Sequence, residues 1–190
     1  MQNLIKQEQF ELEVLERLNS KRFLNHLVFG GGSMLRLGYG LDRYLVDLDF
    51  WIIKDIDVNK LFNDPKEYLA QLYTRTARQA GRQSTSQNKF QALLFEIKSK
   101  NYPRRLKIEI RKEIKEIETE KAIAYSRHSN TQVLLTVVAL KEMMAAKIKS
   151  FLERKEIRDA FDIKFLLKRG IALTADTKTQ ILHIGELQDS

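Results

Sequence analysis

The sequence contains no cysteine and only two prolines, Pro65 and Pro103, among its 190 residues. Without cysteine the chain can form neither a disulfide framework nor a thiolate metal site. No stretch of about 18 apolar residues occurs, so the sequence predicts no membrane-spanning helix. The scarcity of proline, with no repeats and no low-complexity tracts, predicts regular elements joined by short turns. We therefore expect a protein without a membrane segment, compatible with the reducing cytoplasm.

Acidic residues are also too few to balance the basic ones. The chain carries 33 Lys and Arg against 25 Asp and Glu, which gives a net charge of +8 and a pI of about 9.6. Such an excess favours a polyanionic partner such as a nucleic acid, although a soluble protein can simply be basic. The hydrophobic fraction of 43% suits one domain with a real core, or one domain with a helical appendage.

Glycine is scarce as well, yet three of the 8 glycines stand together at residues 30–32 and are followed by Ser33. They fall between a short apolar strand predicted at 26–30 and a short helix predicted at 31–40, which Gly40 would close. Glycines at a strand-to-helix turn let backbone N–H groups approach a phosphate. The spacing is neither a Walker loop nor a dinucleotide-binding fingerprint. A tight turn with close packing is the alternative.

Two aspartates share one side of the next predicted strand, residues 45–53. Because side chains alternate along a strand, Asp47 and Asp49 point the same way, about 7 Å apart, while Leu48 and Phe50 point to the other side. Neighbouring carboxylates repel each other unless a cation, a shared proton or strong solvation stabilises them. Magnesium prefers such oxygen ligands. The alternative is a pair of solvated acids on an exposed strand.

A third acid occupies the same kind of position in a second strand. The segment 104–112 alternates, with Leu106, Ile108 and Ile110 on one side and Glu109 on the other. With the strand at 89–98 and a loop containing Pro103, it predicts a hairpin. Glu109 could be a third metal ligand beside the aspartates, or an exposed strand acid.

The remaining segments predict an α+β order that ends in a helical third. Residues 3–19 have the periodicity of an amphipathic helix, and 58–82 predict a helix broken near Pro65. Residues 81–88 predict a polar turn, and 133–138 an extended segment that leads into a helix. Helices are predicted at 139–154, at 157–169 ending near Gly170, and at 174–188. We expect residues 1–135 to form a core and 136–190 a helical part packed on it; the alternative is one continuous domain.

Charged side chains lie on apolar helix faces in that last third. Lys147 is four residues after Met143 and four before Phe151, and Asp159 and Asp162 are both spaced to fall beside Leu166. A buried charge must be paired or must meet a ligand. These residues could form a salt bridge between two helices. Alternatively, Lys147 could reach a triphosphate while Asp159 or Asp162 orients it; the sequence does not say which aspartate.

The two blocks resemble a known family when they are taken in order. The segment GGGSMLRLGYGLDRYLVDLDFWI, starting at residue 30, resembles the Gly-Gly-Thr/Ser, arginine and Asp-x-Asp-Phe motif of the AbiEii/AbiGii-type toxin nucleotidyltransferases. The segment LKEMMAAKIKSFLERKEIRDAFDIKFLL, starting at residue 140, is similar to their lysine and Arg-Asp-x-x-Asp block. The resemblance implies a polymerase-beta-like nucleotidyltransferase core, a small mixed sheet packed by helices, with a helical C-terminal part.

The resemblance also implies roles for individual residues. Asp47, Asp49 and Glu109 would bind Mg²⁺ or Mn²⁺, and Glu109 would activate the acceptor hydroxyl. The nucleotide, an NTP, would be held by Gly31, Gly32, Ser33, Arg43, Lys147 and Arg158. Catalysis would further involve Lys147 with Asp159 and Asp162.

The implied activity is NMP transfer from an NTP to RNA, in particular tRNA, with release of pyrophosphate. Family members include toxins of bacterial toxin–antitoxin and phage-defence systems, so an antitoxin protein would be a partner. Basic residues could contact RNA phosphates: Arg75, Arg78, Arg82, Arg104, Arg105 and Lys107. The alternatives are a nucleotidyltransferase that modifies a small molecule or a protein, and a catalytically inactive relative that binds RNA or protein.

Overall fold

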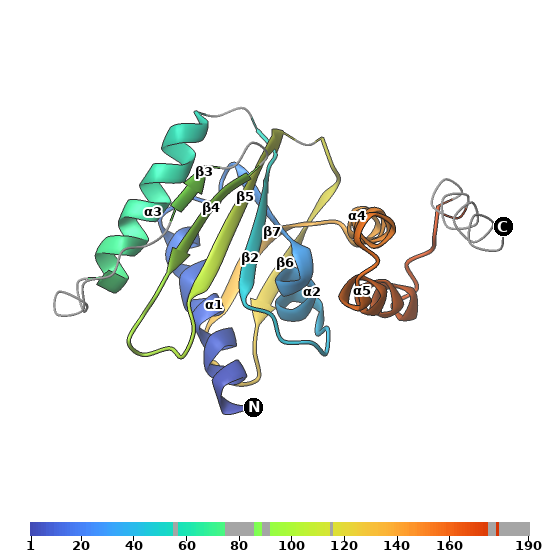
Figure 1. Cartoon of the computed structure of the whole chain (residues 1–190), viewed down its shortest axis with the longest axis horizontal. Helices are drawn as coiled ribbons and strands as arrows, with labels where there is room; N and C mark the ends of the chain where they lie inside the picture. The colour runs from blue at the N-terminus through green and yellow to red at the C-terminus, as the bar shows by residue number, and fades with distance from the viewer. Residues whose placement is uncertain (55–56, 75–85, 89–91, 115, 175–177, 179–190) are drawn as a thin grey trace. The chain divides into compact units, whose positions relative to one another are not determined.

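The computed structural model describes residues 1–54, 57–74, 86–88, 92–114, 116–174 and 178 (Figure 1). Within these residues the chain forms α-helices and one mixed sheet. The helices are α1 (Gln2–Ser20), α2 (Gly31–Tyr39), α3 (Val58–Thr74), α4 (Leu140–Arg154) and α5 (Ile157–Lys168). None of them is both long enough and apolar enough to cross a membrane. The α+β class expected from the sequence is confirmed.

The described strands form one sheet in the order β3-β4-β5-β2-β1-β7-β6. Their bounds are β1 (Leu27–Gly30), β2 (Asp47–Ile52), β3 (Ser86–Asn88), β4 (Ala92–Ile97), β5 (Leu106–Ile114), β6 (Thr119–Tyr125) and β7 (Gln132–Val138). Strand β2 pairs antiparallel with β1 and parallel with β5, and β4 pairs antiparallel with β5. Thus β2 lies inside the sheet, with a hydrogen-bonded neighbour on each side.

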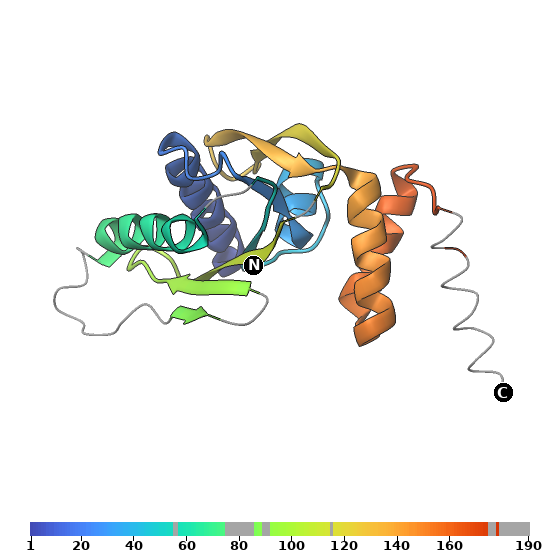
Figure 2. The ribbon, with the colours of Figure 1, turned by 90° about the horizontal axis from the view of Figure 1, so that it is seen from above.

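Helices lie against both faces of the sheet. Figures 1 and 2 show α1 and α3 on one face and α2 on the other. The face under α1 and α3 is apolar, because alternate residues of the central strands point there and are buried, including Phe29, Phe50, Phe95 and Ile108. Burying such side chains stabilises the fold by roughly 1.5–3 kcal/mol each. The intervening residues of β2 and β5 therefore point to the face that carries α2.

Most predicted elements are present, and three expectations need correction. Helix α3 continues through Pro65, although a break was expected there. Proline removes one helical hydrogen bond, but burial of Leu61, Leu69 and Tyr73 along the same helix offsets that loss. The polar turn expected at 81–88 contains strand β3 in its described part. Strand β6 was not predicted, because its sequence TEKAIAY is mostly polar and exposed. The 174–188 helix lies almost wholly outside the described residues.

The chain divides into two compact units, Met1–Val137 and Val138–Ser190. The first contains α1 to α3 and nearly the whole sheet, and the second contains α4 and α5. The carboxylates of β2 and β5 belong to the first unit, whereas Lys147, Asp159 and Asp162 belong to the second.

Candidate active site

Three carboxylates meet where β2 runs beside β5. The parallel register pairs Asp47 with Lys107 and Asp49 with Glu109. Since alternate residues of a strand share a face, Asp47, Asp49 and Glu109 all point to the side of the sheet that carries α2. Leu48 and Phe50 point to the opposite face and are 0% and 1% exposed. The apolar half of the strand thus anchors the polar half in place.

Asp49 lies against the first turn of α2. A Cβ atom built on Gly31 would lie 2.2 Å from Oδ2 and 2.9 Å from Cβ of Asp49. The backbone at Gly31 also has φ +74°, a conformation that other residues rarely adopt. Both facts require glycine at this position. The short turn between β1 and α2 therefore brings the Asp49 carboxylate against the start of a helix.

Burial and the neighbouring carboxylates make Asp49 harder to ionise. Burial, followed by the charges of Glu109 and Asp47, raises the pKa of Asp49 from its ordinary 3.8 to about 6. Arg111 and Lys107 oppose this rise only in part. A carboxyl group with such a pKa is stabilised by an added cation, which makes the cluster a place where positive charge binds favourably.

One cation of the chain already lies among these acids. The ammonium Nζ of Lys107 is 3.1 Å from Oε2 of Glu109 and 3.6 Å from Oδ2 of Asp47. Burial by itself would lower the pKa of Lys107, but the hydrogen bond to Glu109 and the charges of Asp47 and Glu109 outweigh it, so the pKa is raised. Lys107 therefore remains charged and bridges two strand acids.

The donor set fits a hard divalent cation. Carboxylate oxygens are the ligands that magnesium and manganese prefer, and the Lys107 ammonium marks a position where two of these carboxylates accept a positive charge. As the side chains stand, no group of three or more Asp, Glu, His or Cys residues in the described part of the chain is gathered as a metal site. Binding a metal would therefore require these side chains to rotate toward it.

The other predicted residues of this unit surround the start of α2. A Cβ on Gly32 would lie 3.0 Å from Nη2 of Arg43, so the guanidinium lies beside the helix N-terminus. Backbone N–H groups and a nearby arginine suit an anion such as a phosphate. Ser33 is fully buried, and its hydroxyl donates a hydrogen bond to the backbone carbonyl of Asp47. In this structure Ser33 thus connects α2 to the start of β2.

A buried ion pair that was not predicted from the sequence joins α1 to α2. Nε of Arg36 is 2.5 Å from Oε2 of Glu8, and Nη1 of Arg36 donates to the carbonyl of Leu41 at 2.9 Å. The guanidinium also lies 4.0 Å from the ring of Tyr44, and the Ser126 hydroxyl donates to Glu8. Arg36 therefore holds the segment that leads from α2 to β2.

The sequence contained a signal for this pair. Glu8 is four residues after Leu4 and four before Leu12, on the apolar stripe of α1. Glu11 lies on the same stripe and is 1% exposed, and no hydrogen-bond partner is found for its Oε1 within the described residues. Burial, followed by the charges of Glu8 and Asp47, raises the pKa of Glu11 well above its ordinary value. From the sequence, charges on apolar helix faces were predicted only for α4 and α5, so Glu8 and Glu11 of α1 were missed.

The predicted residues of the second unit form an ion-pair cluster between α4 and α5. Nζ of Lys147 is 2.7 Å from Oδ2 of Asp162 and 3.7 Å from Oδ1 of Asp159. Both aspartates are buried, at 0% and 1% exposure. Arg154, which was not predicted, donates to both carboxylate oxygens of Asp159 at 2.9 and 3.1 Å. Arg158 is exposed and pairs with Glu156 instead.

Two of the basic residues that were expected to contact RNA pair with acidic side chains of the protein. Arg105 pairs with Glu96 at 3.1 Å, and Lys107 pairs with the strand acids. Arg75, Arg78 and Arg82 lie outside the described residues.

Comparison with solved structures identifies the class of fold. The chain resembles a protein from H. pylori described as a candidate nucleotidyltransferase, with a TM-score of 0.52, 21% identity, and coverage of 84% of this chain and 68% of that one. It also resembles JHP933 from Helicobacter pylori, with a TM-score of 0.48 and 22% identity over 80% of this chain and 66% of that one. The chain thus spans about two thirds of the length of these proteins. The first comparison shows a nucleotidyltransferase-type fold.

The sequence then assigns the family. A family model described as the nucleotidyl transferase AbiEii toxin of a type IV toxin–antitoxin system matches residues 13–183. The chain belongs to this AbiEii family, and by family it is a nucleotidyltransferase. No curated protein matches it. The match includes every residue that the sequence predicted for the site.

Proposed function

We propose that this protein transfers a nucleoside monophosphate from an NTP to a hydroxyl group of an RNA acceptor, in particular a tRNA, as the toxin of a bacterial toxin–antitoxin or phage-defence system acting in the cytoplasm. The observation that carries the proposal is the register of β2 and β5, which sets Asp49 beside Glu109 at the start of α2. The net charge of +8 is consistent with an RNA partner.

Each residue has a defined task in this proposal. Asp47, Asp49 and Glu109 would hold Mg²⁺ or Mn²⁺, which when bound neutralises the triphosphate charge and stabilises the in-line transition state. The N-terminal turn of α2 and Arg43 bind phosphate oxygens. Glu109 accepts the proton of the acceptor hydroxyl, whose oxygen forms a bond to the α-phosphorus. The bond from the α-phosphorus to the β-phosphate bridging oxygen breaks, and pyrophosphate leaves.

The charge clusters have supporting tasks. Asp47 and Glu109, which pair with Lys107 in this structure, would hold the divalent cation, and the Lys107 ammonium would then be available to a phosphate oxygen. Lys147, Asp159, Asp162 and Arg158 are further candidates for the nucleotide, and Lys147 is the cation among them that could meet the triphosphate. The ion pairs observed in the second unit support equally well a purely structural task for Lys147.

The test is incubation of the protein with each α-labelled NTP, Mg²⁺ and total RNA, followed by gel separation of the RNA. We expect label in RNA with one NTP. The Asp47→Ala/Asp49→Ala variant should lose it by at least about a thousandfold, because positioning and charge stabilisation supply most of such catalysis. Asp64→Ala removes an exposed carboxylate of α3 and should label normally. Full labelling by the double variant would rule out the proposed site.

A different acceptor gives a different result in the same assay. Label that appears only in protein or in small molecules would replace the RNA acceptor while retaining the transfer chemistry. A family member that only binds would give no label with any NTP or acceptor.

A further inference from the structure

A groove opens at the end of the sheet opposite the carboxylates. It has a volume of about 480 Å³ and lies within the first unit. Its walls come from the end of α1 and the following loop, from the last residues of β2, and from β6 and β7. Its polar lining includes Asn19, Asn25, Lys54, Lys121 and Thr136.

The groove is positively charged. Among the residues of its lining that the structure describes there are two lysines and neither an aspartate nor a glutamate. The ammonium of Lys121 is fixed by a 2.8 Å hydrogen bond to the Thr136 hydroxyl. Asn19 is positioned by a hydrogen bond to the Leu134 carbonyl at 3.4 Å. An anion with several oxygen atoms, such as a phosphodiester, would meet donors that are already in place.

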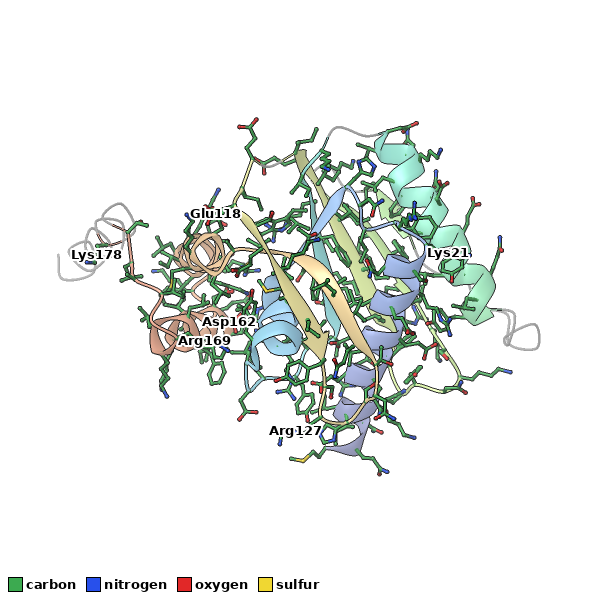
Figure 3. All side chains as sticks on the ribbon, turned by 180° about the vertical axis from the view of Figure 1, so that it is seen from behind. Lys21, Glu118, Arg127, Asp162, Arg169 and Lys178 are labelled. Carbon is green, nitrogen blue, oxygen red and sulfur yellow. The ribbon has the colours of Figure 1, made fainter. Side chains whose placement is uncertain are left out.

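The groove continues into an open sheet surface. Ala122 of β6 lies 3.6 Å from a Cβ built on Gly38 of α2, so the odd positions of β6 point away from α2, and Thr136 of β7 shares their side because it accepts a hydrogen bond from Lys121. Three apolar side chains of these strands are exposed: Ile123 at 50%, Tyr125 at 51% and Leu134 at 59%. In Figure 3 these two strands face the viewer, with α1 beside them and α2 behind. Lys121 lies on the same side of β6 as Tyr125. A half-exposed aromatic ring on the strand that carries Lys121 is a surface on which an unpaired base can stack.

We propose that this groove and the open face of β6 and β7 dock the RNA acceptor, with the phosphodiester backbone on Lys54 and Lys121 and an unpaired base on Tyr125. The proposal rests on the RNA acceptor of the proposed function. Ile53 at the groove is four positions after Asp49, which corresponds to about 13 Å along the strand at 3.3 Å per residue. Because Phe29 and Phe50 line the groove while the carboxylates point to the other face of the sheet, the acceptor must pass around the end of the sheet, and an RNA is long enough to do so.

The test measures RNA binding separately from catalysis. Fluorescence anisotropy with labelled total tRNA, without NTP, gives the Kd over a series of salt concentrations. We expect Lys54→Ala/Lys121→Ala to raise the Kd about tenfold and to lower the slope of log Kd against log salt by about one to two. Tyr125→Ala should raise the Kd about fivefold or more. Lys121→Arg keeps the charge and should bind nearly as the unaltered protein.

Control variants and kinetics show whether a raised Kd comes from the groove or from a general loss of positive charge. Lys6→Ala/Lys98→Ala removes two exposed charges of the first unit that do not line the groove, and should change the Kd much less. In the labelling assay the KM for RNA should rise in Lys54→Ala/Lys121→Ala while the KM for NTP stays constant. Thermal melts check that each variant is folded, which we expect because the substituted side chains are exposed.

The outcomes separate this proposal from the one on which it rests. Unchanged Kd and salt slope in Lys54→Ala/Lys121→Ala, with RNA still labelled by the unaltered protein, would overturn the docking groove alone. A raised KM for NTP instead of RNA would make the groove a nucleotide site. If the unaltered protein neither binds nor labels RNA, the RNA acceptor and the docking groove both fail, and a protein partner becomes the occupant to test.

Discussion

At the scale of single residues, Asp49 connects stability to pH. Its pKa is about 6 in the folded protein, above its ordinary value of 3.8. Between these two values the folded state binds more protons than the unfolded state, so the free energy of unfolding falls as pH rises from about 4 to about 6. The Asp49→Asn variant lacks this pH-dependent fall in the free energy of unfolding. It should therefore be more stable than the unaltered protein at pH 8, by on the order of 1–3 kcal/mol, and similar below pH 4.

Urea unfolding of both proteins at pH 4 and pH 8, without metal, measures this difference. Adding Mg²⁺ at pH 8 should stabilise the unaltered protein but not Asp49→Asn, because the cation relieves the repulsion among the carboxylates. A stability difference that does not depend on pH would mean that Asp49 is not the titrating group.

At the scale of elements, the Glu8–Arg36 ion pair between α1 and α2 should strengthen nucleotide binding. Glu8 holds Arg36, and Arg36 holds the Leu41 carbonyl in the segment that carries Arg43. Glu8→Gln weakens this connection, so we expect the KM for NTP to rise about three- to tenfold with a smaller change in kcat. In an Arg43→Ala background the same change should have little further effect, since both act on one contact.

Helix α1 provides a matched control for this experiment. Glu13 is five residues further along and accepts hydrogen bonds from the phenols of Tyr73 and Tyr102 instead of from Arg36. Glu13→Gln should lower the melting temperature and leave the KM unchanged. Equal KM effects of the two variants would show that α1 acts only through overall stability.

Variants of the ion-pair cluster between α4 and α5 distinguish a structural task of Lys147 from a catalytic one. Asp162→Asn leaves the Lys147 ammonium without its partner at 2.7 Å and should cost roughly 3–5 kcal/mol of stability. Arg158→Ala, at an exposed side chain, should cost less than about 0.5 kcal/mol. Replacing both partners with apolar residues, Lys147→Met/Asp162→Leu, should recover most of the stability.

Activity of that double variant decides the role of Lys147. If Lys147 meets the triphosphate, the double variant is stable and inactive in the labelling assay. Stability and activity that return together would make the cluster structural. Urea unfolding and RNA labelling on the same samples give both quantities.

At the scale of the whole molecule, features that depend on neighbouring residues could be predicted from the sequence, whereas contacts between distant segments could not. The alternation around Asp47, Asp49 and Glu109 placed each acid on the polar side of its strand, because that alternation is set by neighbouring residues. Which strand lies beside β2 is not written in its own sequence, so the bridging position of Lys107 was missed and an RNA contact was expected instead. The Glu8–Arg36 pair was missed for the same reason, as it joins two helices.

Edge elements were the least predictable. Strand β6 borders the sheet and exposes most of its side chains, so its polar sequence lacks the apolar alternation of β5. A strand of this kind is recognised only once the rest of the sheet is in place. The docking groove is built partly from β6 and was equally invisible in the sequence.

The parallel pairing of β2 with β5 also bears on when the site forms during synthesis. Asp49 and Glu109 are 109 − 49 = 60 residues apart in the chain, with α3, β3 and β4 between them. Contacts of such long range form only after the intervening loop has closed, which is a slow step of folding. A ribosome-bound chain that does not yet reach Glu109 therefore has no assembled carboxylate cluster, and a member of a toxin family gains its reactive centre only when more than half of it has been made.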